Sequence, residues 1–139
     1  MRAWAIAVAL LLCACHRRGE EATSIQAPPI DVAAAVAGCT GATDCERKCD
    51  GGAVASCVEL GRLYEFGHVG ARNPVEAYRW YERACGLGNA AGCYNQALLL
   101  EGGRGVARDK TRAGMLFRRV CQMGAKTACA RAEEWSAAP

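Results

Sequence analysis

Cysteine offers the clearest chemistry in this sequence, which has ten cysteines among 139 residues. So many thiols in a short chain indicate an oxidising compartment, where they are joined as disulfides. Within each of three cysteine doublets the partners are eight positions apart, and corresponding members of successive doublets are 36 apart. The doublets are Cys49 and Cys57, Cys85 and Cys93, and Cys121 and Cys129.

A second chemistry is conceivable at Cys45 and Cys49, which would lie one helical turn apart and flank Arg47 and Lys48. Two neighbouring cations can lower the pKa of a thiol, so a redox or metal-binding role is one interpretation. The other interpretation, which we favour, is that both are oxidised structural cysteines.

The elements that position these cysteines follow from the 36-residue period, which is typical of a solenoid of stacked supersecondary units. Cys57, Leu60, Gly61 and Tyr64 have the i, i+3, i+4, i+7 spacing of one helix face, and Cys93, Gln96, Ala97 and Leu100 repeat it. Glycine-bearing turns at residues 67–70 and 102–105 should end these two helices.

A second helix is predicted after each turn. Asn73 is expected as the N-cap, with Pro74 in the first position and Glu76 returning a reciprocal hydrogen bond; Asp109 has the matching place in the next unit. The buried faces of these helices are predicted to be Ala77, Trp80, Tyr81 and Ala84, and Ala113, Leu116, Phe117 and Val120.

A closing helix is predicted from about Thr127 to Trp135. It carries Glu133 where the earlier helices have Gly61 and Ala97, and a charge at a packing position is typical of a capping end. The predicted fold is therefore all-α, a short α/α solenoid of antiparallel helix pairs with about two and a half repeats.

Three strings in the folded part carry a family resemblance. They are Leu60 to Gly67, Tyr78 to Cys85, and Gly103 to Val106 with Asp109, and they resemble Sel-like repeats (SLR). Together with the cysteine doublets they resemble the cysteine-rich, Hcp-type bacterial members of that family. The inverted Val69-Gly70 order, and Ala97 where the family more often has glycine, are departures in turn and packing detail.

The resemblance implies a disulfide within each doublet, joining one helix pair to the next, and leaves Cys39 and Cys45 as the remaining pair. Geometry alone would also permit Cys57–Cys85 and Cys93–Cys121 bridges, because antiparallel helices bring those ends together.

Hcp-type proteins are also catalogued as β-lactamases or penicillin binders, which makes β-lactam or cell-wall-peptide binding, or weak hydrolysis, the alternative function. A serine β-lactamase needs a lysine one helical turn after its serine, and none of Ser24, Ser56 and Ser136 has one. The two histidines, His16 and His68, are too few and too far apart for a catalytic metal cluster. We therefore expect no catalytic residue, metal or cofactor.

The N-terminus has the features of an export signal. Arg2 precedes an apolar stretch from Ala3 to Leu12, and Leu12-Cys13-Ala14-Cys15 resembles a bacterial lipobox. The resemblance implies cleavage after Ala14 and lipid attachment to Cys15; an ordinary signal peptide is the alternative. His16 after the lipidated cysteine favours the outer membrane, by analogy with bacterial sorting rules.

The predicted organisation is a signal peptide over residues 1–14, a flexible tether over 15–38 and a repeat domain over 39–139, with repeats at about 49–84 and 85–120 and a partial capping repeat at 121–139. Residues 39–100 contain six Lys/Arg and seven Asp/Glu, whereas residues 101–139 contain eight and four. An acidic partner or an anionic membrane lipid would suit this basic half, although a solvated face is the simpler interpretation. No aromatic residues interleave these cations, so nucleic acid is not expected.

These observations predict a cell-envelope lipoprotein whose concave helical surface binds an envelope protein or peptide. The candidate partner-binding residues are on the first helix of each pair, off its buried face: Glu59, Arg62, Asn95 and Leu99.

Overall fold

The computed structural model describes residues 38–136. The predicted signal peptide, Cys15 and the tether as far as residue 37 lie outside the described residues. The described part contains six helices and no strand: α3 (Ala42–Asp50), α4 (Val54–Phe66), α5 (Pro74–Gly86), α6 (Ala90–Gly102), α7 (Lys110–Gln122) and α8 (Lys126–Ser136).

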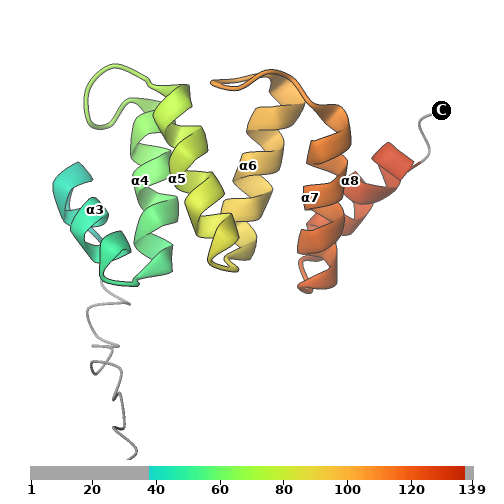
Figure 1. The fold of residues 1–139 in the computed structure, drawn as a ribbon, viewed down its shortest axis with the longest axis horizontal. Coiled ribbons are helices and arrows are strands. Elements are labelled where there is room, and N and C mark those ends of the chain that lie inside the picture. Colours follow the sequence, from blue (N-terminus) through green and yellow to red (C-terminus); the bar gives the residue numbers. More distant parts are fainter. Residues whose placement is uncertain (1–37, 137–139) are drawn as a thin grey trace, which may run out of the picture. The chain divides into compact units, whose positions relative to one another are not determined.

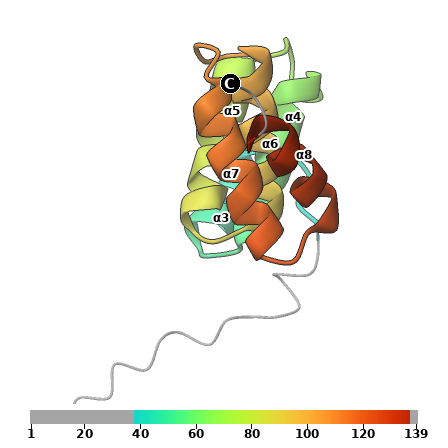
Figure 2. The same ribbon diagram turned by 90° about the vertical axis from the view of Figure 1, so that its right-hand side faces the viewer.

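Each helix packs antiparallel against the next along the chain, which produces the stack in Figure 1. Viewed from the end of the stack, α5 and α7 lie in one layer and α4, α6 and α8 in the other (Figure 2). The first helices α4 and α6 also contact each other directly. The prediction of an all-α solenoid of helix pairs is confirmed.

Helix α3 is an element that the sequence analysis did not list. Its Cys49 stands 36 residues before Cys85 of α5, so α3 corresponds to the second helix of a pair, and no first helix of that pair is among the described residues. The described stack therefore begins with a lone second helix, α3, and ends with a lone first helix, α8.

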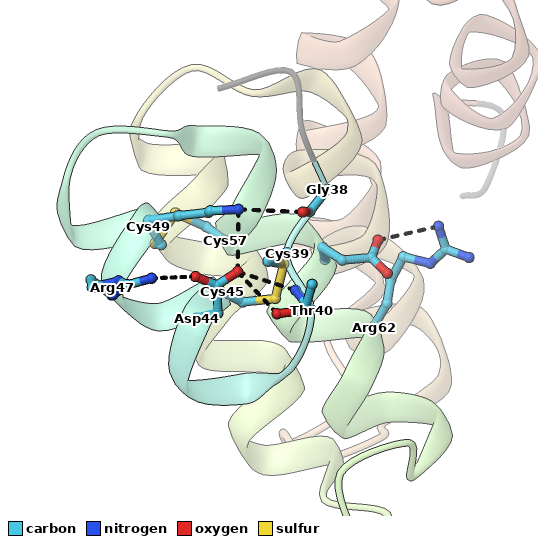
Figure 3. Close-up of a disulfide and its surroundings, with 11 residues drawn as sticks. Gly38, Cys39, Thr40, Asp44, Cys45, Arg47, Cys49, Cys57 and Arg62 are labelled. Atoms are coloured by element: carbon cyan, nitrogen blue, oxygen red, sulfur yellow. Dashed lines mark hydrogen bonds and ion pairs between the residues drawn. A yellow bond between two sulfur atoms is a disulfide. The ribbon is translucent and has the colours of Figure 1, made fainter. Parts of the chain in front are cut away.

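The segment before α3 is tied to that helix by the Cys39–Cys45 disulfide and by Asp44 (Figure 3). The Asp44 carboxylate accepts a hydrogen bond from the Thr40 N–H at 3.1 Å and pairs with Arg47 at 2.6 Å and Lys48 at 3.2 Å. The Thr40 N–H, followed by the two cations, lowers the pKa of Asp44 to about 2, because all three favour the ionised carboxyl.

The predicted helix ends are largely as observed. Gly67 and Gly103 end α4 and α6 in the left-handed region, with φ of 79° and 65°. Asn73 caps α5 by accepting a hydrogen bond from the Glu76 N–H at 3.2 Å, and Asp109 caps α7 in the same way.

The reciprocal hydrogen bond expected from Glu76 to Asn73 is not formed. The Asn73 N–H donates to the Tyr64 carbonyl at 2.9 Å, because the turn folds back onto the end of α4. The Glu76 carboxylate instead pairs with Arg79 at 2.7 Å.

The core runs between the two layers and contains most of the side chains predicted for it. Tyr81 and Phe117, which are 36 residues apart, are both fully buried. Tyr64, Trp80 and Leu116 are only partly buried and pack against the edge of the core. The layers approach closely where a helix has glycine, as at Gly61 beside the Tyr81 ring.

Disulfides join each second helix to the first helix that follows it. Cys49–Cys57 links α3 to α4, Cys85–Cys93 links α5 to α6, and Cys121–Cys129 links α7 to α8, with Cα–Cα distances of 4.9, 4.4 and 4.6 Å. The alternative Cys57–Cys85 and Cys93–Cys121 pairings are not formed. Each bridge closes the short turn at one end of the stack.

Candidate functional site

The outward positions of α4, α6 and α8, which share one layer of the stack, make up a face that we call the first-helix surface (Figure 2). Its side chains are exposed or half-buried and come from corresponding places in successive repeats. Helix α4 contributes Val58, Glu59 and Arg62; α6 contributes Tyr94, Asn95 and Leu98; α8 contributes Ala130, Arg131 and Glu134.

Three of the four predicted binding residues, Glu59, Arg62 and Asn95, lie on this surface. The prediction for Leu99 is wrong, because its side chain is 0% exposed and belongs to the core. Helix α6 lies between α5 and α7 and also contacts α4, so it is covered on more than one side. Three consecutive leucines at 98–100 have no helical period, so the sequence does not show which of them is buried. In the structure Leu98 is the one that is partly exposed.

The middle row of the surface holds three different polar groups on three consecutive first helices. Glu59 pairs with Arg62 of its own helix at 3.6 Å (Figure 3). Arg131 pairs with Glu101 at 3.0 Å, and its guanidinium lies 5.6 Å from the centre of the Phe117 ring. Asn95, between them, makes no side-chain hydrogen bond among residues 38–136, which leaves its amide free to bind a partner.

A partly buried carboxylate, that of Glu65, links the two repeats at the opposite end from the disulfide-closed turns. Glu65 accepts a hydrogen bond from the Tyr81 hydroxyl at 2.8 Å and pairs with Arg104 of the next turn at 2.8 Å. Burial and the neighbouring Glu65 raise the pKa of Tyr81 well above its usual range. Glu65, Arg72, Pro74 and Arg104 line a pocket of about 250 Å³ here.

The sequence analysis did not identify this carboxylate, although a signal was present. Glu65 and Arg72 recur 36 residues later as Glu101 and Arg108. In both turns the arginine Nε donates to the glutamate carbonyl, at 3.1 and 2.9 Å. In each repeat the arginine side chain thus closes the turn by bonding to the backbone carbonyl at the end of the first helix.

Gln96 is a buried polar residue that lies on the helix face predicted to be buried. Its amide donates to the Tyr78 hydroxyl at 3.0 Å and to Glu82 at 3.3 Å, and Glu82 also pairs with Arg112. Because these bonds satisfy the amide, its burial between α5 and α6 is tolerated. Burial also raises the pKa of Tyr78.

The residues considered for catalysis or metal binding are not brought together. Cys45 and Cys49 belong to different disulfides, Ser56 is buried within α4, and His68 is exposed beside Phe66. Within residues 38–136 no group of three or more His, Cys, Asp or Glu side chains could hold a metal ion. The β-lactam alternative stays a prediction.

Comparison with known families identifies the repeats. The sequence model of the Sel1 repeat matches residues 54–89 and 90–124, which together make up half of the chain. The chain belongs to the Sel1 repeat family. The two matched segments contain α4 with α5 and α6 with α7, so each Sel1 repeat is one helix pair.

Solved structures of other Sel1 repeat proteins have the same fold. Cysteine-rich protein B of Helicobacter pylori is 27% identical, with a TM-score of 0.61 over 64% of this chain and 67% of that one. A Sel1 repeat protein from Oxalobacter formigenes is 26% identical, with a TM-score of 0.63 over 67% and 70%. No curated protein matches the sequence.

A third structure is much longer than this chain. It is a protective antigen of uropathogenic Escherichia coli with an SLR fold, and it is 28% identical with a TM-score of 0.61. The match covers 66% of this chain but only 20% of the antigen. Sel1 repeats generally form protein-interaction modules, and this chain presents the helical solenoid that such modules share.

Proposed function

We propose that this Sel1 repeat protein is a cell-envelope lipoprotein whose first-helix surface binds a protein or peptide. The observation that carries the proposal is the row formed by Glu59, Asn95 and Arg131 on consecutive first helices. The amide at its centre has no hydrogen-bond partner among the described side chains, so a ligand can bind it without displacing a contact of the folded protein.

The chemistry of the row suits an extended peptide segment that crosses the three helices. An asparagine amide both donates and accepts, and can therefore pair with the two polar groups of a peptide bond. Glu59 would favour a basic ligand residue over α4, and Arg131 an acidic one over α8. Tyr94 and Leu98 pack partly against the core, and the exposed parts of their side chains would supply apolar contact beside Asn95.

The envelope location is supported by the sequence. The apolar stretch ending at Cys15 and the eight cysteines of the folded part both suit an exported protein. An anchor at Cys15 would keep the binding surface near a membrane while the intervening residues give it reach.

Capture of envelope partners by photo-crosslinking tests the binding surface. A photoreactive residue in place of Leu98 should crosslink a discrete partner, and Asn95→Ala should reduce that product at least tenfold, because the amide contact is lost. The matched control is a photoreactive residue in place of Arg79, which is exposed on α5 in the other layer.

The Asn95→Ala protein must retain its melting temperature for the loss to be assigned to binding. Equal crosslinking from positions 98 and 79, or undiminished crosslinking by Asn95→Ala, would contradict the proposal.

A further inference from the structure

The three disulfide-closed turns have the same backbone structure. In residues 86–89 the Leu87 N–H donates to the Arg83 carbonyl at 3.1 Å, and Gly88 has a φ of 85°. Residues 122–125 repeat both features at Met123 and Gly124, and residues 50–53 repeat them at Gly51 and Gly52. Because each turn is also bridged by a disulfide, its tip is held in one conformation.

Two of these tips carry a large apolar side chain that faces solvent. Leu87 is 54% exposed and Met123 is 44% exposed, and they occupy the same place in consecutive turns. Both turns lie at the same end of the stack, at the bottom of Figure 1. We call this end the stapled end, and we include in it Leu87, Met123 and three nearby cations, Arg118, Arg119 and Lys126.

Helices α7 and α8, which meet at the second tip, carry an excess of cations. Residues 110–132 include six Lys/Arg and no Asp or Glu. Arg112 and Arg131 are engaged by Glu82 and Glu101, and Lys110 lies over the Trp135 ring. The other three, Arg118, Arg119 and Lys126, lie before and after the tip in sequence, are exposed and have no carboxylate within ion-pair distance among the described residues. Arg119 makes one long contact, to Cys85 Sγ at 4.0 Å.

The chain also enters its folded part at this end. The carbonyl of Gly38, the first described residue, accepts a hydrogen bond from Lys48 Nζ at 3.3 Å. Lys48 lies in the last turn of α3, next to the first disulfide-closed turn. Whatever precedes Gly38 therefore joins the repeats beside the stapled end.

We infer that the stapled end contacts the anionic lipid headgroups of the membrane to which the chain is anchored. This inference rests on the lipid anchor of the proposed function. Leu87 and Met123 would enter the headgroup layer, while Arg118, Arg119 and Lys126 pair with lipid phosphates. Exposed apolar tips flanked by cations that have no carboxylate partner suit such a layer, and the chain enters its folded part at this same end.

The contact would also orient the molecule. The helices run from the stapled end to the opposite end of the stack, so they would stand away from the membrane (Figure 1). The first-helix surface would then remain open to partners alongside the membrane.

Hydroxyl-radical footprinting of the full-length, lipidated protein on vesicles tests this contact. On vesicles containing phosphatidylglycerol, modification of Leu87 and Met123 should fall at least threefold relative to phosphatidylcholine vesicles. Met115 is an internal control of the same residue type, because it is 56% exposed on α7 but about 12 Å further from the turn. Its modification should be the same on both vesicles.

A variant with Arg118→Ser, Arg119→Ser and Lys126→Ser should lose the protection while staying on the vesicles through its anchor. For the protein without these substitutions, retention on the vesicles without protection of Leu87 and Met123 overturns the membrane contact alone, and so does undiminished protection in the triple variant. Release of the protein from washed vesicles overturns the anchor and the contact together. Protection by an acidic envelope protein but not by phosphatidylglycerol assigns the stapled end to a protein partner and also overturns the contact.

Discussion

At the scale of single residues, the absence of a side chain at position 61 determines how closely α4 and α5 approach. A Cβ atom there would lie 2.5 Å from Cε1 of Tyr81, whose ring is fully buried between the layers. The ring cannot withdraw easily, because its hydroxyl is hydrogen-bonded to Glu65. The next repeat has Ala97 and Phe117 at the corresponding places, without the hydroxyl.

We therefore expect Gly61→Ala to lower the free energy of unfolding by about 1–3 kcal/mol, because it overpacks the α4–α5 contact. Chemical denaturation measures this change. The control is Gly86→Ala at the end of α5, where a Cβ would meet nothing within 4 Å and the change should be small. Equal effects of the two substitutions would show that helix propensity, and not packing, controls position 61.

At the scale of elements, the disulfides compensate for the small number of helix pairs. Most contacts of α8 are with α7, because no second helix follows α8 in the described part of the chain. Its register on α7 depends on Cys121–Cys129 and on Trp135, which packs against Gly114. The terminal helix is thus the element that depends most on its bridge.

Replacing Cys121 and Cys129 together by alanine should cost about 2.5 kcal/mol, the chain-entropy value for a loop of about eight residues. Amide exchange should accelerate most in α8, since that helix has one neighbour, and least in α6, which has several. Replacing Cys39 and Cys45 is the control, because that bridge lies in the segment around the start of α3. Uniform acceleration across all helices would argue against a local effect of the bridge.

At the scale of the whole molecule, different parts of the chain have different proposed roles. The anchor holds the protein at the membrane, the stapled end contacts the lipid, and the first-helix surface binds the partner. The three disulfides of the doublets and the apolar tips lie at one end of the stack, and the Glu65 pocket lies at the other. The binding row runs across the first helices between them. Anchoring and partner binding would therefore not compete for the same surface.

Intact mass of protein extracted from its native envelope tests this division of the chain. Cleavage after Ala14 should leave a mature chain that carries the mass of a diacylglycerol group on Cys15. Reduction should then add two hydrogens for each of the four disulfides of the described part. An unmodified N-terminus would contradict the proposed lipid anchor. A smaller mass gain on reduction would show that not all four disulfides form in the native protein.

The sequence alone was sufficient for the repeat length, the helix pairs, the caps at Asn73 and Asp109 and the presence of a last helix after the two pairs. These features depend on local spacing and on the conformational preferences of glycine, proline and short polar side chains, which act over a few residues. Only the tertiary structure decided which face of α6 is buried, and therefore that Leu98 and not Leu99 belongs to the surface. It also brought Glu65 to Arg104 and placed the turns that carry Leu87 and Met123 at the same end of the stack, because the arrangement of the repeats depends on how the helices stack in space and leaves no period within a single helix.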